Sequence, residues 1–231
     1  MKLTVVGCSP AWPNPGRAHS GYLLTHDEGR LLVDCGPGVL SRLREAEPWP
    51  IVDAIAITHM HIDHYGDLAA WLWGQLHVPP PGTPAPKLWL PPGGSNALDH
   101  VASRFHDVFE IEEYADATPF ETAGFSVSPV AVAHYTQPTW GFRIEAKGKI
   151  AAFSADTGPT PVLAELAAGA DVFLCEATLD EVEAGPRGHL TAAEAEAAGA
   201  GARRLLLVHR PTELPTPHGL ELAYDGLELQ L

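Results

Sequence analysis

The chain has 231 residues, and its 14 Lys and Arg against 29 Asp and Glu give a formal net charge of −15. Such acidity argues against a protein whose whole surface collects nucleic-acid phosphates, because sequence-independent binding of that kind depends on Lys and Arg. A hydrophobic content of 45% excludes a disordered chain, and no apolar run is long enough to cross a membrane, so we expect no membrane partner.

Short apolar runs typical of strands recur along the chain, and helical patterns lie between them. Strands are predicted at Leu3–Gly7, Gly21–Thr25, Leu31–Asp34, Ala54–Thr58, Lys87–Leu90, Phe125–Ala133, Gly141–Glu145, Ile150–Ser154, Val172–Cys175, Leu205–His209, Leu220–Ala223 and Leu227–Leu231. Helices are predicted at Val39–Ala46, Asp67–His77, Asn96–Val108, Pro161–Ala168 and Thr191–Ala200. Because no Rossmann fingerprint and no internal repeat is present, we expect one domain, residues 1–231, of two sheets covered by helices.

Local signals add detail to this outline. Thr191 followed three residues later by Glu194 is a capping box, which predicts where the last helix begins. Asp225-Gly226 between the last two strand patterns predicts a hairpin turn. The cysteines are odd in number and widely spaced, so we expect buried thiols and a reducing, cytoplasmic location, and the N-terminus does not resemble a signal peptide. The three cysteines are Cys8, Cys35 and Cys175.

The turn after the predicted strand Ala54–Thr58 carries an unusual concentration of metal ligands. Three histidines and one carboxylate, His59, His61, Asp63 and His64, lie within six residues. The alternating pair of histidines should face one way and the following Asp-His pair another. Imidazole nitrogen and carboxylate oxygen are ligands of Zn²⁺, so the turn predicts two adjacent metal ions.

Two metal ions need more ligands than one turn provides, and suitable residues stand at other predicted strand ends. His134 ends one strand pattern, Asp156 follows another and His209 ends a third. Each alone is more often a satisfied histidine or a turn aspartate. Together with the His-rich turn, these placements favour a shared metal site on loops held by strands.

This set of residues, with Gly36-Pro37-Gly38 and Ser154–Gly158, resembles the metallo-β-lactamase superfamily over nearly the whole chain. The resemblance implies an α/β (α+β) fold, a four-layer αβ/βα sandwich with the metals at the sheet edges. It implies that one metal is bound by His59, His61 and His134, that the other is bound by Asp63, His64 and His209, and that Asp156 bridges both. Asp34 matches an aspartate that holds the ligand loops in place and does not bind metal.

The donor set favours two Zn²⁺ ions, with Mn²⁺ as the second choice. The antibiotic-cleaving members of this superfamily have Cys where Asp156 stands, and the iron flavoproteins have Glu where His61 stands, so the chain matches neither. Thioesterases of the glyoxalase type share the His/Asp set, and the ligands alone therefore leave the substrate class open.

The stretches Asp171–Ala177 and Gly188–Thr191 resemble the phosphodiesterase branch that includes ribonuclease Z. The resemblance implies that His189 reaches the site and protonates or polarises the phosphate, and that Glu176 orients His189 or a ligand. Ribonuclease Z carries its tRNA-clamping arm between the positions of His134 and Asp156. Only 21 residues lie between them here, enough for a strand pair, which argues against a tRNA-processing enzyme. The stretches Val6–Pro10, Ser20–Leu24 and Leu32–Leu40 look most like the arm-less bacterial members.

These observations predict a metal-dependent phosphodiesterase for a small phosphodiester, with a 3′,5′-cyclic nucleotide as the leading candidate. Asp63 would orient the nucleophile, and His189 would stabilise charge or protonate the leaving oxygen. A ribonuclease Z-like tRNA 3′-end endonuclease and a non-catalytic metal-binding protein are the alternatives. The acidic charge argues against a large nucleic-acid partner, and the resemblance suggests a homodimer. Whether the pocket is lined by further residues stays open for His19, Trp71, Trp73, Tyr135 and Arg210.

Overall fold

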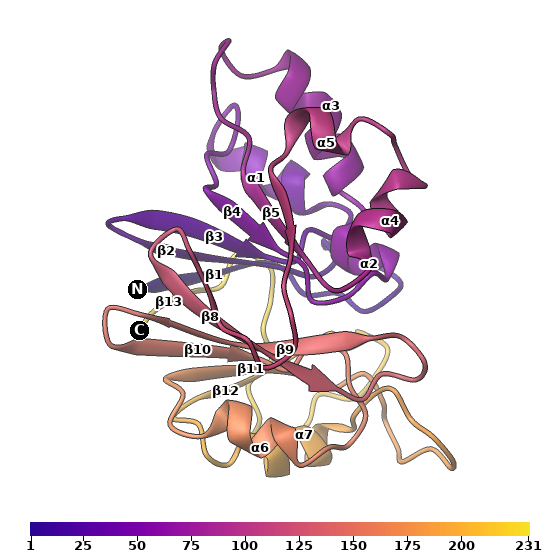
Figure 1. Cartoon of the computed structure of the whole chain (residues 1–231). Coiled ribbons are helices and arrows are strands. Elements are labelled where there is room, and N and C mark those ends of the chain that lie inside the picture. The colour runs from indigo at the N-terminus through magenta and orange to yellow at the C-terminus, as the bar shows by residue number, and fades with distance from the viewer.

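Two β-sheets lie face to face in the computed structural model, which describes residues 1–231, and helices cover the outer face of each sheet (Figure 1). The first sheet has the strand order β13 (Glu228–Gln230), β1 (Lys2–Gly7), β2 (Gly21–His26), β3 (Gly29–Val33), β4 (Ala54–Ala56), β5 (Lys87–Leu90) and β6 (Ile111–Glu113). The second has the order β12 (Leu205–Val208), β11 (Val172–Glu176), β10 (Lys149–Phe153), β9 (Thr139–Ala146), β8 (Phe125–Val132) and β7 (Phe120–Thr122). The predicted four-layer αβ/βα sandwich is confirmed.

The helices form the two outer layers. Those over the first sheet are α1 (Val39–Ala46), α3 (Leu68–His77), α4 (Gly94–Asp99) and α5 (Phe105–Val108), and those over the second are α6 (Val162–Ala167) and α7 (Ala192–Gly199) (Figure 1). A single turn, α2 (Ile62–Tyr65), lies near the end of β4. None of these helices has both the length and the hydrophobicity needed to cross a bilayer.

Alternating side chains fill the layers between these elements, because successive residues of a strand point to opposite faces of its sheet. In β3, Leu31 and Val33 are fully buried in the core between the two sheets, whereas Leu32 packs into the core under the helices. All three cysteines are buried and free, as the sequence predicts.

The helix predicted over Asn96–Val108 is wrong, since the structure has α4 and α5 with a non-helical link between them. Leu98 and Phe105, two helical turns apart in the sequence, are both fully buried. Val101 between them is 46% exposed, so the central turn has no apolar face to bury and gains no packing.

The predicted C-terminal hairpin is also wrong. Leu222 forms a bridge with Leu207 of the second sheet, whereas Leu229 in β13 pairs with Leu3 of the first sheet. The Asp225-Gly226 turn therefore carries the chain from one sheet to the other. It is held there by the Gly226 N–H, which donates to Val5 O over 2.7 Å.

Candidate metal centre

The residues predicted as metal ligands converge at one edge of the sandwich. Strands β8, β10 and β12 run in the same direction, so the loops that follow them meet at the same edge of the second sheet. The turn after β4 joins this edge from the first sheet, because Trp140 N, in β9, donates to Thr58 O over 3.2 Å. The residues brought together are His59, His61, Asp63, His64, His134, Asp156 and His209.

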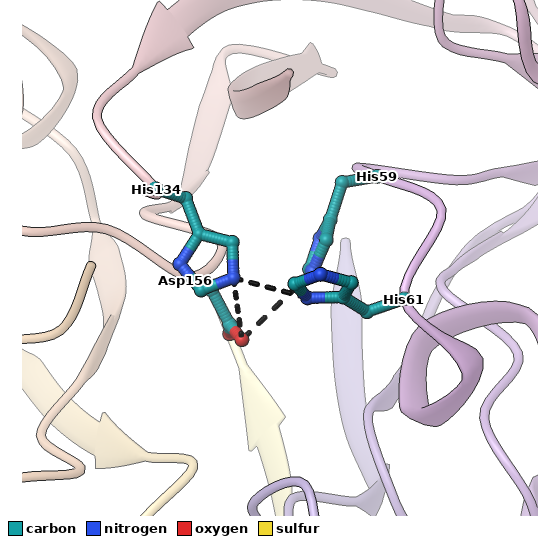
Figure 2. A group of neighbouring side chains, drawn as sticks. All are labelled: His59, His61, His134 and Asp156. Atoms are coloured by element: carbon teal, nitrogen blue, oxygen red, sulfur yellow. Dashed lines mark hydrogen bonds and ion pairs between the residues drawn. The ribbon is translucent and has the colours of Figure 1, made fainter. Parts of the chain in front are cut away.

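The first group consists of His59, His61, His134 and Asp156, whose ligand atoms lie within 4.8 Å of one another. Figure 2 shows the three rings and the carboxylate turned toward a common point. His134 Nε2 lies 3.0 Å from His61 Nδ1 and 3.9 Å from Asp156 Oδ2. Ligand atoms 2.0–2.1 Å from a tetrahedral Zn²⁺ would be about 3.3 Å apart, so the group has the size of a metal site.

The second group consists of Asp63, His64, Asp156 and His209, again within 4.8 Å. His64 Nε2 lies 3.5 Å from Asp63 Oδ2 and 3.4 Å from Asp156 Oδ1. His209 Nε2 lies 3.2 Å from Asp63 Oδ2 and 3.5 Å from Asp156 Oδ2. Asp156 thus belongs to both groups, as a bridging ligand would.

Two buried nitrogens of these groups, His59 Nε2 and His64 Nε2, have no hydrogen-bond partner. A buried polar atom without a partner is costly, and a metal ion is one partner that satisfies it. The donor set of imidazole and carboxylate is also that of divalent transition metals. The residues present therefore fit divalent metal ions in both groups.

Hydrogen bonds on the far side of the His134 and His209 rings leave their Nε2 atoms free to bind. His134 Nδ1 donates to Gly188 O over 2.7 Å. Thr178 Oγ1 gives its own proton to Glu176, so it accepts from His209 Nδ1 at 2.9 Å. Such outer partners fix the tautomer and orientation of a metal-binding histidine.

Asp34 supports the His-rich turn from beneath and belongs to neither ligand group. Its buried carboxylate accepts from Thr58 N over 2.8 Å, from Thr58 Oγ1 over 3.0 Å and from His64 Nδ1 over 2.8 Å. Thr58 Oγ1 in turn lies 3.2 Å from His59 Nδ1. One carboxylate therefore orients one ring of each group, and burial raises its pKa although these donors oppose the shift.

The imidazoles of the first group are in the form that binds metal. Burial lowers the pKa of His59 well below its ordinary value, and it also lowers the pKa of His61 and of His134. These rings are therefore neutral at pH 7, and a neutral imidazole carries the lone pair that coordinates a cation.

The two carboxylates that face these rings remain ionised. Burial works against ionisation of Asp63 and Asp156, but the neighbouring histidines outweigh it and hold both pKa values below the ordinary range. Burial also opposes protonation of His64, yet the charges of Asp156 and Asp34 raise its pKa well above the usual value. The same negative potential attracts a divalent cation.

A third group, Glu176, His189 and His209, adjoins the second. His189 Nδ1 lies 2.8 Å from Glu176 Oε1, and its ring stacks on that of His209 with centroids 5.7 Å apart. The His189 side chain is 15% exposed, so it borders the opening to solvent. Burial tends to lower the pKa of His189, but the hydrogen bond and charge of Glu176 raise it overall.

Two devices hold this third group in place. The buried Glu176 carboxylate also accepts from Thr157 N at 2.9 Å and from Thr178 N at 3.0 Å. Two residues after His189, the predicted capping box is present: Thr191 N donates to Glu194 Oε2 over 2.9 Å, and Glu194 N donates back to Thr191 Oγ1 over 3.3 Å.

Several contributors were not found from the sequence. Thr58 and Thr178 orient the rings of His59 and His209. Their positions are the only sign of this role in the sequence, since Thr58 directly precedes His59 and Thr178 completes the Glu-Ala-Thr stretch. His209 and Tyr135, next to His134, have left-handed backbones with φ of 54° and 47°. A positive φ in a bulky residue is strained and tends to occur at functional sites.

Of the residues whose place at the pocket the sequence left open, some border the site and others do not. Trp71 is fully buried under the first sheet and packs edge-on against Trp49, so it cannot form a pocket wall. Trp73 is 49% exposed on α3 and lies beside Arg104. Tyr135 borders the site, because its ring contacts His189 with centroids 5.7 Å apart.

The remaining two are buried in the surrounding loops. His19 Nδ1 lies 2.9 Å from Pro10 O. Its pKa is lowered chiefly by burial, and Asp63 and His209 are close enough to influence it. Arg210 donates to the backbone carbonyls of Ala177 and Pro215, which hold its guanidinium group in the loops around the site.

A double-sheet fold with two adjacent His/Asp groups at its edge is that of a metallo-β-lactamase-type hydrolase. Residues 29–210 match the model of the beta-lactamase superfamily domain, and the chain belongs to this superfamily. An uncharacterized protein of Mycobacterium tuberculosis is 36% identical over 227 residues, covering 91% of this chain and 81% of that protein. A ribonuclease Z of Mycobacterium marinum is 31% identical over 193 residues, covering 75% of this chain and 69% of the relative.

Solved structures agree on the fold. The metallo-beta-lactamase fold protein YhfI from Bacillus subtilis has a TM-score of 0.87 at 22% identity, with 99% of both chains covered. A diphosphatase from the PhnP family has a TM-score of 0.81 at 23% identity, covering 100% of this chain and 97% of that one. Zn²⁺-bound PqqB from Methylobacterium extorquens has a TM-score of 0.80 at 20% identity, with 100% of both chains covered. The superfamily and the His/Asp groups together indicate a metal-dependent hydrolase that uses divalent metal ions.

Proposed function

We propose that this protein is a phosphodiesterase that hydrolyses a small phosphodiester, with a 3′,5′-cyclic nucleotide as the leading candidate. The observation that carries the proposal is His189, held by the buried Glu176 carboxylate and stacked on His209 at the opening of the site. A positioned imidazole there is what the alkoxide leaving group of a phosphodiester requires. Two similar proteins, a ribonuclease and a diphosphatase, also act on phosphate compounds.

The ligand assignment is part of the proposal. One divalent ion would be held by His59, His61 and His134, a second by Asp63, His64 and His209, and Asp156 would bridge them. Zn²⁺ is our first choice and Mn²⁺ the second, and a zinc-bound protein of the same fold supports the first. When bound, such ions supply Lewis acidity that polarises phosphoryl oxygens and acidifies water.

The chain's own residues would then divide the remaining work. His189 keeps Nδ1 on Glu176, which leaves Nε2 to hold a proton for the leaving oxygen, and its raised pKa favours the protonated form. Asp63 stays ionised, so its carboxylate can orient the attacking nucleophile by accepting a hydrogen bond. The exposed ring of Tyr135, beside His189, would form one wall for the substrate.

The short segment between His134 and Asp156 favours a small substrate over tRNA. Strands β9 and β10 occupy most of this interval, and only the short segments 135–138, 147–148 and 154–155 lie outside them, so no arm projects from it. The net charge of −15 is also unfavourable for a large RNA. A ribonuclease Z-like activity remains the second candidate, because the Mycobacterium marinum relative carries that name.

The test is a hydrolysis panel on the purified protein: 3′,5′-cyclic AMP, bis-p-nitrophenyl phosphate, precursor tRNA and a thioester. Each substrate is assayed as purified, after chelation, and after re-addition of Zn²⁺ or Mn²⁺. We expect chelator-sensitive turnover of the cyclic nucleotide. Cleavage of precursor tRNA alone would support the second candidate, and hydrolysis of the thioester alone would refute the phosphodiesterase branch. A metal-loaded protein inactive on every substrate would indicate a non-catalytic metal-binding protein.

We also propose that the protein forms a homodimer and works in the cytoplasm, as expected from the resemblance and from the free, buried thiols. Light scattering coupled to gel filtration measures the first directly. A monomer mass at all concentrations would contradict it.

A further inference from the structure

Tyr135, at the opening of the site, combines an exposed aromatic ring with a strained backbone. It directly follows His134, and its φ of 47° lies in the left-handed region, which is unfavourable for a bulky residue. The residue is 56% exposed, so burial of the ring does not offset this strain. Strain of this kind tends to persist where it serves a function.

The Tyr135 ring lies flat on the backbone of Gly188, the residue before His189. A side-chain carbon at Gly188 would overlap Cδ2 and Cε2 of the ring, which are equally close to its position, and would be 2.8 Å from Cγ. Such a point lies above the face of the ring, because a point beyond its edge would be much farther from Cγ. Gly188 does not have the left-handed backbone that would itself demand glycine, so what this position requires is the absence of a side chain.

The other neighbours of the ring leave its second face open. The His189 ring meets it edge-on, with an angle of 75° between the ring planes, and the His134 ring is tilted against it by 53° with centroids 5.2 Å apart. Neither ring stacks on Tyr135, and no Lys or Arg lies over it. One face of Tyr135 is therefore covered by Gly188, and the opposite face is open to solvent beside His189.

We propose that the open face of Tyr135 stacks on the base of a nucleotide, so that Tyr135 and Gly188 make the site selective for nucleotides over other phosphodiesters. This inference rests on the proposed function, in which His189 serves the leaving oxygen. In a 3′,5′-cyclic nucleotide that oxygen belongs to the sugar, and the base on the same sugar can reach the adjoining Tyr135 ring. Because every base has an aromatic face, we expect little preference among the bases.

The test measures binding and needs no turnover. Isothermal titration calorimetry on the zinc-loaded protein compares 5′-AMP, which has a base and a phosphate, with ribose 5-phosphate, which has no base. We expect the affinity of Tyr135→Ala for AMP to be lower than that of the wild type by about tenfold or more, because one base–aromatic stack is lost, and its affinity for ribose 5-phosphate to be unchanged. Tyr135→Phe keeps the ring and should keep both affinities. Tyr224→Ala, at a tyrosine of similar exposure outside the site, is the matched control and should also keep both.

Equal affinities of the wild type and Tyr135→Ala for AMP, or no binding of AMP to the wild type, would overturn the proposal. Its failure is distinguishable from a failure of the proposed function. A loss of AMP affinity in Tyr135→Ala supports the stacking even if no phosphodiester is hydrolysed. Hydrolysis of the cyclic nucleotide together with equal AMP affinities would refute the stacking alone.

Gly188→Ala tests the support beneath the ring. The added side chain would push the Tyr135 ring away, so we expect the affinity for AMP to fall in this variant as well. In the Tyr135→Ala background the same substitution should change that affinity by less than about twofold, because no ring remains to be displaced. Additive losses would show that Gly188 acts through His134, whose Nδ1 donates to its carbonyl, and would remove Gly188 from the proposal.

Discussion

Asp156 is the single side chain that belongs to both His/Asp groups. Its Oδ1 faces His64 Nε2 at 3.4 Å, and its Oδ2 faces His59 Nε2 at 3.9 Å. Its removal should therefore weaken both groups together, whereas the loss of any one histidine affects one group directly.

We expect Asp156→Ala to lose both metal ions along with activity. Metal content per chain, measured by inductively coupled plasma mass spectrometry after gel filtration, checks this directly. Asp99→Ala, at an exposed position outside the site, is the control and should keep the full metal content. One ion retained per chain in Asp156→Ala would contradict the bridging role.

His189 lies beside the ligands but outside the two groups that contain Asp156, so its loss should separate chemistry from metal binding. We expect His189→Ala to keep its metal content while turnover falls by roughly 10²–10⁴-fold, the usual contribution of a positioned acid–base group. Steady-state kinetics alongside metal analysis measures both. His106→Ala, at an exposed histidine, should leave turnover unchanged, and undiminished turnover in His189→Ala would remove this residue from the mechanism.

At the scale of elements, the capping box at the start of α7 holds the backbone next to His189 in place. Thr191→Ala removes the side chain that caps the helix, and we expect the free energy of unfolding to fall by about 1 kcal/mol. Urea denaturation measures this change. Glu196→Ala, exposed on the same helix, should shift it by less than about 0.5 kcal/mol. Equal effects of the two substitutions would show that the capping box does not stabilise the helix.

The site residues could be predicted best where a buried strand ends in a polar residue. His134, Asp156 and His209 each follow such a strand, and the shared direction of β8, β10 and β12 brings them together. Prediction failed where packing overrides local pattern. Val101 has the apolar spacing of a helix but is exposed, and the Asp225-Gly226 turn has hairpin chemistry but links two sheets.

At the scale of the whole molecule, the ligand set could be predicted because histidines and aspartates are rare at the ends of buried strands. The side chains that hold these ligands from behind could not be predicted, because Thr178 meets His209 only when two strands of the second sheet lie side by side.

The proposed metal ions would also join the two halves of the sandwich. His59, His61, Asp63 and His64 come from the first sheet's side, and the remaining three ligands follow strands of the second sheet. A ligand that binds only the folded state stabilises it by mass action, by about 2.7 kcal/mol at a concentration 100-fold above its dissociation constant.

We therefore expect chelation to lower the melting temperature of the wild-type protein by about 5–10 °C, because 1 kcal/mol corresponds to roughly 2–4 °C in a chain of this size. Differential scanning calorimetry with and without chelator, followed by re-addition of Zn²⁺, measures the change and its reversal. Asp156→Ala is the matched control. Because both ligand groups are incomplete in this variant, its melting temperature should not respond to the chelator. If chelation lowers the melting temperature of the wild type and of Asp156→Ala equally, the stabilising metal binds elsewhere, because Asp156 belongs to both His/Asp groups.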